Sequence, residues 1–99
     1  MNLYLNKDAI VINNKFENQI FIYNRKMHQK SIINEDMFEI LEYIYNNEGI
    51  TLKELNEVYD DLTEIINSLI SLDILTKRKQ KRCNNIKKLK DKNNARLFV

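Results

Sequence analysis

Few side chains in this sequence could carry out covalent or metal chemistry, and their placement argues against both. The single thiol, Cys83, lies in a lysine-rich stretch, and the single imidazole, His28, lies in a predicted strand. A nucleophile needs a base beside it, and a structural zinc site needs four clustered ligands. Neither requirement is met, so Cys83 and His28 are interpreted as ordinary residues.

The paired carboxylates have a simpler explanation than acid–base catalysis. Glu35-Asp36 and Asp60-Asp61 each stand at a predicted helix start, where the helix dipole favours anions. With one glycine in the whole chain, no glycine-rich phosphate loop is possible. We therefore expect a non-catalytic domain with no catalytic residue, no metal site and no cofactor of its own.

Length and composition favour one globular domain in the cytoplasm. The chain has 99 residues, of which 43% are hydrophobic, and its one cysteine cannot form an internal disulfide. Its first eight residues lack the basic and apolar regions of a signal peptide. No apolar stretch approaches the roughly 20 residues of a membrane span, so no membrane partner is expected.

The charge divides the chain into two parts. Residues 1–76 hold 6 Lys/Arg and 13 Asp/Glu, a net charge of −7, whereas residues 77–99 hold 10 Lys/Arg and 1 Asp, a net charge of +9. Residues 77–92 have almost no apolar content to offset the entropy of ordering, which predicts a linker or a frayed helix. We expect a recognition domain over 1–76 and a basic linker or tail over 77–99, which could begin a following catalytic domain.

Three short segments predict the strands of an antiparallel meander. Residues 9–12 and 19–23 are apolar runs, residues 28–33 form a third strand, and turn-forming residues separate the three. Three strands need another layer to cover one of their faces.

Three helices follow, each with its own signals. Asn34 is a plausible N-cap for a first helix, whose apolar stripe ends before Gly49. Thr51 and Glu54 form a capping box that opens a short second helix. Asp60 or Asp61 caps a third helix, which runs to about Leu72. The predicted fold is α+β, winged helix-turn-helix-like, with a three-stranded antiparallel sheet followed by three helices.

Helix-turn-helix folds often read DNA, which makes a winged-helix transcription regulator the alternative function. In that case the third helix would enter the major groove and its side chains would meet phosphates. That helix carries two acidic residues and no basic one, so a duplex would repel it. We expect no specific nucleic-acid binding, and only weak, salt-sensitive binding through the basic tail.

The third helix has a wide apolar arc, of about 160° on a helical wheel, that favours a peptide groove. Beside the edge of the third strand, this arc would suit a peptide that enters as an added strand. We expect one edge of the arc, Ile66 and Ile70, to be partly exposed and to line the groove. If the N–H of Ser31 points outward, proline there would abolish binding, whereas proline at Lys30 would break the internal ladder. The predicted peptide-binding residues are His28, Gln29, Lys30, Ser31, Ile32, Ile33, Leu62, Ile66 and Ile70.

The pattern over about residues 4–76 resembles the PqqD-like recognition elements of ribosomally made, modified peptide pathways. The resemblance is carried by Ile33-Asn34 leading into Ile40-Leu41, then by Thr51 to Leu55, Ile65 to Leu69, and Asp73 to Leu75. It implies binding of a precursor's leader peptide between strand three and helix three. One departure is an extra residue between Gly49 and Thr51.

The end of the chain, residues 94–99, resembles the first barrel strand of radical SAM peptide-modifying enzymes. This implies a modifying enzyme in cis or in trans, with S-adenosylmethionine and an iron–sulfur cluster only in that partner or downstream domain. A free-standing recognition protein remains open, as does a protein–protein adaptor. The exposed strand edge could also pair with a second copy as a homodimer.

Overall fold

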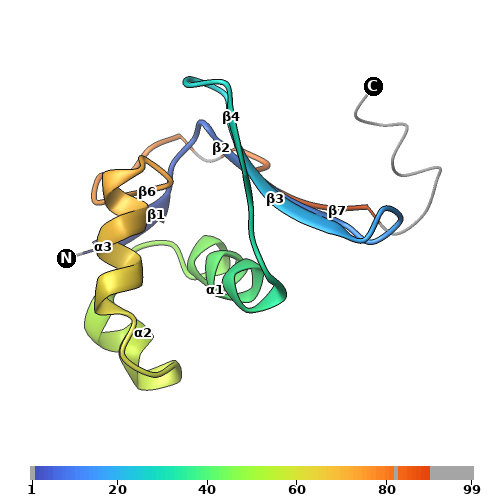
Figure 1. Ribbon diagram of the computed structural model, residues 1–99. Helices are drawn as coiled ribbons and strands as arrows, with labels where there is room; N and C mark the ends of the chain where they lie inside the picture. Colours follow the sequence, from blue (N-terminus) through green and yellow to red (C-terminus); the bar gives the residue numbers. More distant parts are fainter. Residues whose placement is uncertain (1, 82, 90–99) are drawn as a thin grey trace.

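The computed structural model describes residues 2–81 and 83–89, which form a small α+β domain with two sheets and three helices (Figure 1). The smaller sheet has the order β5-β1-β6 and the larger one β4-β3-β2-β7. The strands are β1 (Asn2–Leu5), β2 (Ala9–Asn14), β3 (Gln19–Asn24), β4 (Gln29–Ile32), β5 (Ile50–Thr51), β6 (Leu75–Thr76) and β7 (Ile86–Leu89). The helices are α1 (Glu35–Asn46), α2 (Leu52–Val58) and α3 (Thr63–Ser71).

The predicted meander is present as β2, β3 and β4, which pair antiparallel in chain order. Ala9 and Val11 of β2 and Ile22 of β3 face inward and are buried in the same core as the helices. The sequence did not predict the smaller sheet, in which β1 pairs with two strands of only two residues each. The domain therefore has more strands than the expected three.

Two of the three predicted helix starts are confirmed by the caps that they make. The predicted cap of the third helix by Asp60 or Asp61 is wrong, because Leu62 stands at the N-cap of α3 with no side-chain cap hydrogen bond. The Asn34 side chain accepts a hydrogen bond from the Met37 amide at 2.8 Å and opens α1. Thr51 and Glu54 form the reciprocal capping box at the start of α2. Gly49 adopts φ +85°, a conformation that strongly favours glycine, in the turn that leads α1 into β5.

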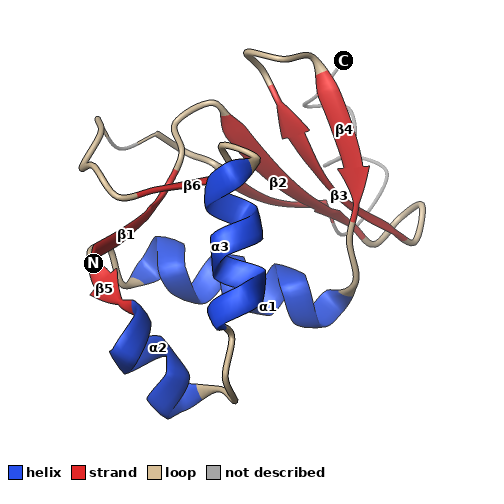
Figure 2. Cartoon of the chain, turned by 60° about the vertical axis from the view of Figure 1, so that its left-hand side comes forward, coloured by secondary structure: helices blue, strands red, loops and turns tan. Residues whose placement is uncertain are grey.

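The core lies where the helices pack against the inner faces of the two sheets, and Figure 2 shows the helices gathered on one side of the larger sheet. Burying one face of each amphipathic element removes its apolar surface from water, which is the main favourable term in folding. The largest fully buried side chains come from both sheets and all three helices: Leu3, Val11, Leu41, Ile44, Leu55, Ile66 and Leu75.

The prediction of a linker or frayed helix over residues 77–92 is wrong for Ile86–Leu89, which form β7 and pair parallel with β2. Polar contacts help to hold this strand, beside the partly buried Ile86 that packs against the core. The buried Asn85 side chain donates to the carbonyl oxygens of Asn6, Lys7 and Ala9 at 3.2, 3.1 and 2.7 Å. Lys88 also pairs with Glu42 of α1 at 2.6 Å. The predicted strand-like ending, 94–99, lies outside the described residues.

Replacing Asn85 with alanine should release β7 from the sheet. Three carbonyl oxygens would lose a buried donor, and leaving such groups unsatisfied costs about 1–3 kcal/mol. Amide hydrogen exchange should accelerate at Ile86 and Lys87 and change little in β3. Asn84→Ala is the matched control because Asn84 is exposed. Unchanged protection of β7 in Asn85→Ala would show that other contacts hold the strand.

Candidate peptide-binding cleft

An open cleft lies between β4 and the C-terminal end of α3. Its cavity volume is about 110 Å³, below the usual range for small-molecule pockets. One wall comes from the β3–β4 hairpin and the other from the end of α3 and the residues that follow it. The lining residues are Ile22, Asn24, Met27, Gln29, Ser31, Ser71, Leu72, Asp73 and Ile74.

β4 is an edge of the larger sheet, and its hydrogen-bond register decides which main-chain groups are free. The Ile33 amide donates to the Ile20 carbonyl at 3.0 Å, which makes these two residues a hydrogen-bonded pair. Such pairs alternate along an antiparallel ladder, so Ser31 bonds inward to Ile22 and Gln29 to Asn24. The main-chain groups of Lys30 and Ile32 therefore point away from β3, toward the open edge.

This register reverses the expectation for proline substitutions. Ser31, expected to offer its N–H outward, belongs to the internal ladder, and Lys30, expected inside the ladder, faces outward. The sequence could not settle this point, because a shift of one residue exchanges the two roles.

The side chains of β4 alternate between the cleft and the outer face of the sheet. Gln29 and Ser31 line the cleft. On the outer face, Ile32 is 64% exposed, and the Lys30 ammonium lies 4.3 Å from the centre of the Phe21 ring. The Lys30 Nζ also donates to Gln19 Oε1 at 3.3 Å. The lysine is thus folded back over the sheet.

His28 lies in the turn before β4, so the predicted start of this strand at His28 is wrong by one residue. It has φ +53°, and its Nδ1 is 3.2 Å from the hydroxyl of Tyr23. The Asn24 side chain accepts hydrogen bonds from the amides of Lys26 and Met27, both at 3.0 Å. These bonds form a turn after β3, so the next strand begins one residue later than predicted.

On α3, the apolar arc is buried differently from the prediction. Ile66, expected to be partly exposed, is fully buried at 0% exposure, and Leu62 is also buried, whereas Ile70 is partly buried. The exposed apolar side chains are Ile65 (38%) and Leu72 (59%), at the opposite edge of the arc. Of these two side chains, Leu72 lines the cleft, so the cleft reaches that edge of the arc at the C-terminal end of α3. Helical periodicity gives an arc two edges and does not say which one is covered.

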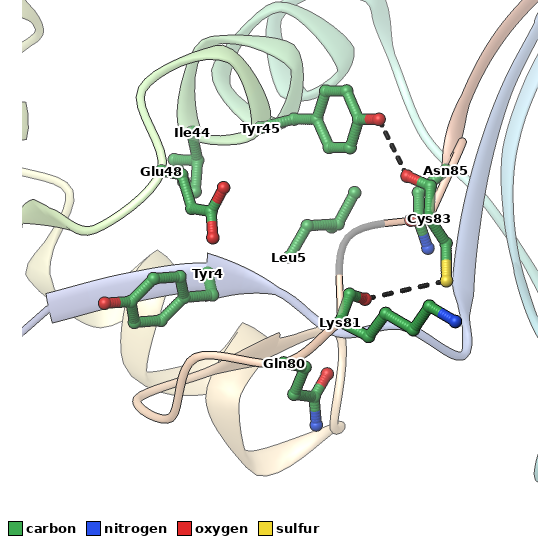
Figure 3. Close-up of a pocket in the computed structure, with 9 residues that line it drawn as sticks. All are labelled: Tyr4, Leu5, Ile44, Tyr45, Glu48, Gln80, Lys81, Cys83 and Asn85. Atoms are coloured by element: carbon green, nitrogen blue, oxygen red, sulfur yellow. Dashed lines mark hydrogen bonds between the residues drawn. The ribbon is translucent and has the colours of Figure 1, made fainter.

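A second hollow surrounds Cys83, where the segment before β7 packs over β1 and α1 (Figure 3). The Tyr45 hydroxyl donates to the Cys83 carbonyl at 2.7 Å, and the Cys83 thiol lies 3.6 Å from the Lys81 carbonyl. Both contacts are to main-chain oxygens, which is typical of a packing contact between two segments.

Within residues 2–81 and 83–89, no group of three His, Cys, Asp or Glu side chains is placed to hold a metal ion.

The start of α3 is a strongly anionic region. Hydrogen bonds from the Thr63 side chain and then from its amide lower the pKa of Asp61 below its usual value, so this carboxylate keeps its charge in mildly acidic solution. Nearby, burial raises the pKa of Tyr59, as do Glu39, the Tyr43 ring and Glu42 in smaller measure.

No described helix is long and apolar enough to cross a bilayer.

Comparisons with known proteins return no match: no family model, no curated protein and no solved structure is similar to this chain. The functional argument therefore rests on the geometry and charge of the cleft.

Proposed function

We propose that this domain binds the leader region of a ribosomally synthesised precursor peptide. The leader enters as an added β-strand between β4 and α3, which together form a winged-helix-like unit. The bound leader presents the downstream core peptide to a modifying enzyme, of the radical SAM type, in cis or in trans. Tethering raises the effective concentration of the core at the active site. One observation carries the proposal: the unpaired main chain of β4 borders a cleft whose far wall includes the exposed Leu72.

The edge of β4 lacks the usual protection against pairing. In natural proteins, proline, charged side chains or covering segments prevent an edge strand from pairing with other chains. Here Lys30 is the only charged residue of the strand, and its ammonium is drawn back over Phe21. Ile32 stays exposed beside it. A peptide strand would satisfy the outward N–H and C=O groups and cover this apolar surface, which is the basis of β-strand addition.

The alternative of a DNA-binding regulator has less support. Glu64 lies in the first turn of α3, and Asp61 and Asp73 flank the helix, which contains no basic residue. Bringing this helix to a duplex would place its carboxylates beside the phosphates, whose negative charge DNA-binding proteins normally neutralise. The basic residues at 77–81 could give weak affinity that falls steeply with salt.

The proposal is tested by titrating the whole chain with a candidate leader, taken from a short reading frame beside a radical SAM gene. Amide shifts should concentrate at Lys30, Ile32 and Leu72. Shifts confined to α2 or to residues 77–81 would contradict strand addition. So would sequence-specific duplex binding that persists at high salt.

Shortening Leu72 to alanine should weaken binding of that leader by roughly 5- to 30-fold. Covering its exposed surface should contribute about 1–2 kcal/mol, and the fold should lose little because the side chain already faces water. Isothermal calorimetry would measure the change. Val58→Ala is the matched control, because Val58 is similarly exposed (54%) but lies on α2. Equal affinities in both variants would place the leader elsewhere.

A further inference from the structure

The charges on this domain are separated along the direction of the cleft. Residues 34–73, which span the three helices, hold eleven acidic residues and one basic residue. At the start of α3, the carboxylates of Asp60, Asp61 and Glu64 are all exposed. Figure 2 shows that α3 begins far from the β3–β4 turn and ends at the height of β4. These carboxylates do not line the cleft; they lie beyond it, on the side toward which β4 runs.

Three segments distant in sequence bring basic residues to the other end. The Arg25 guanidinium donates to the Lys7 carbonyl at 2.7 Å, which ties the β3–β4 turn to the β1–β2 turn. The Lys7 amide in turn donates to Gln80 Oε1 at 2.8 Å, which anchors the basic segment 77–81 to the same turn. The exposed basic residues of the two turns are Lys7, Arg25 and Lys26, and Lys77, Arg78 and Lys79 lie in the segment tethered through Gln80. Lys81 lies instead at the hollow beside Tyr45.

Two carboxylates lie at this basic end, Asp73 in the cleft wall and Asp8 beside Arg25. They are outnumbered by the basic residues, so the end remains cationic. The hydrogen bonds that Arg25 donates to the Lys7 carbonyl and that the Lys7 amide donates to Gln80 hold these segments together in the folded chain.

A peptide that pairs with β4 has a defined direction if it continues the antiparallel pattern of β2, β3 and β4. Antiparallel pairing is slightly more stable per residue than parallel pairing. β4 runs from the β3–β4 turn toward α1. An antiparallel peptide would therefore enter the cleft from the side on which α3 begins and leave it past Arg25 and Lys26.

We propose that the domain selects a charge-polarised peptide, with basic residues before the paired segment and acidic residues after it. This inference rests on the proposed strand addition and adds the chemistry of the ligand. Opposite charges at both ends fix the direction of the strand, whereas main-chain pairing alone is indifferent to sequence.

Three synthetic peptides test the inference with the whole chain. All share one central segment of alternating leucine and serine; the first has two lysines before it and two glutamates after it, the second has these flanks exchanged, and the third has serine flanks. Fluorescence anisotropy at low salt should show the first binding about tenfold more tightly than the second, since each exposed charge pair contributes little by itself. The third should fall between them, and the gap should shrink at about 0.5 M salt.

Charge-reversal variants locate the effect. Asp60→Lys combined with Glu64→Lys should remove most of the preference for the first peptide, and Lys26→Glu should reduce it. Asp61 is left unchanged because it accepts hydrogen bonds from Thr63. Glu39→Lys is the control, because Glu39 lies beside Lys15 and Lys88, away from the cleft.

The outcomes separate the two proposals. Equal binding of the first two peptides, or tighter binding of the second, overturns the charge inference and leaves strand addition standing. If none of the three binds, strand addition itself is contradicted. A preference that survives in the Asp60–Glu64 double variant also overturns the assignment.

Discussion

Proline at position 32 is expected to weaken peptide binding severely while the fold persists. The Ile32 N–H points to the open edge of β4, so the ring removes a donor that the domain does not use internally. Losing one main-chain hydrogen bond to the bound peptide costs about 1–3 kcal/mol, or roughly 5- to 150-fold in affinity. Anisotropy with the lysine-first peptide measures the loss, and circular dichroism checks the fold.

Two further variants isolate the main-chain effect. Ile32→Ala keeps the donor and should lose much less affinity than Ile32→Pro. Ser31→Pro removes a donor from the β3–β4 ladder and should lower the unfolding midpoint. If Ile32→Pro binds the peptide with wild-type affinity, β4 is not the strand with which the peptide pairs.

The parts of the fold that sequence predicted are those that depend on neighbouring residues. Asn34, and Thr51 with Glu54, satisfy amides within three residues of themselves, so their patterns are readable in the chain. The β2–β3–β4 meander likewise joins consecutive runs through short turns. Such signals are local, and they determine most of the helices and hairpins.

The missed strands depend on distant partners. Leu3 pairs with Ile50, and Leu5 with Leu75, contacts that no local pattern encodes in strands of two residues. β7 is held through Asn85, whose three acceptors lie 76 to 79 residues away. A lysine-rich segment with little apolar content is thus a strand that one buried amide, the parallel ladder with β2 and the packing of Ile86 hold together.

The candidate site shows the same division. The third strand of the meander could be recognised as a possible edge, but the outward role of Lys30 and Ile32 depends on a one-residue register. The apolar arc of α3 could be recognised too, but not which edge faces the cleft. That choice depends on where α3 meets the β3–β4 hairpin, a tertiary contact between elements about 40 residues apart.

Ile66 gives the second large expected effect, on stability. Its side chain is fully buried in the core shared by α1, α3 and both sheets, so Ile66→Ala removes packed apolar atoms and leaves a cavity. Such truncations cost about 2–5 kcal/mol, which urea denaturation would measure as a lower midpoint. Ile65→Ala, one residue away but 38% exposed, should cost much less stability and weaken peptide binding instead. Equal destabilisation by the two variants would contradict the assignment of Ile66 to the core and of Ile65 to the cleft side of α3.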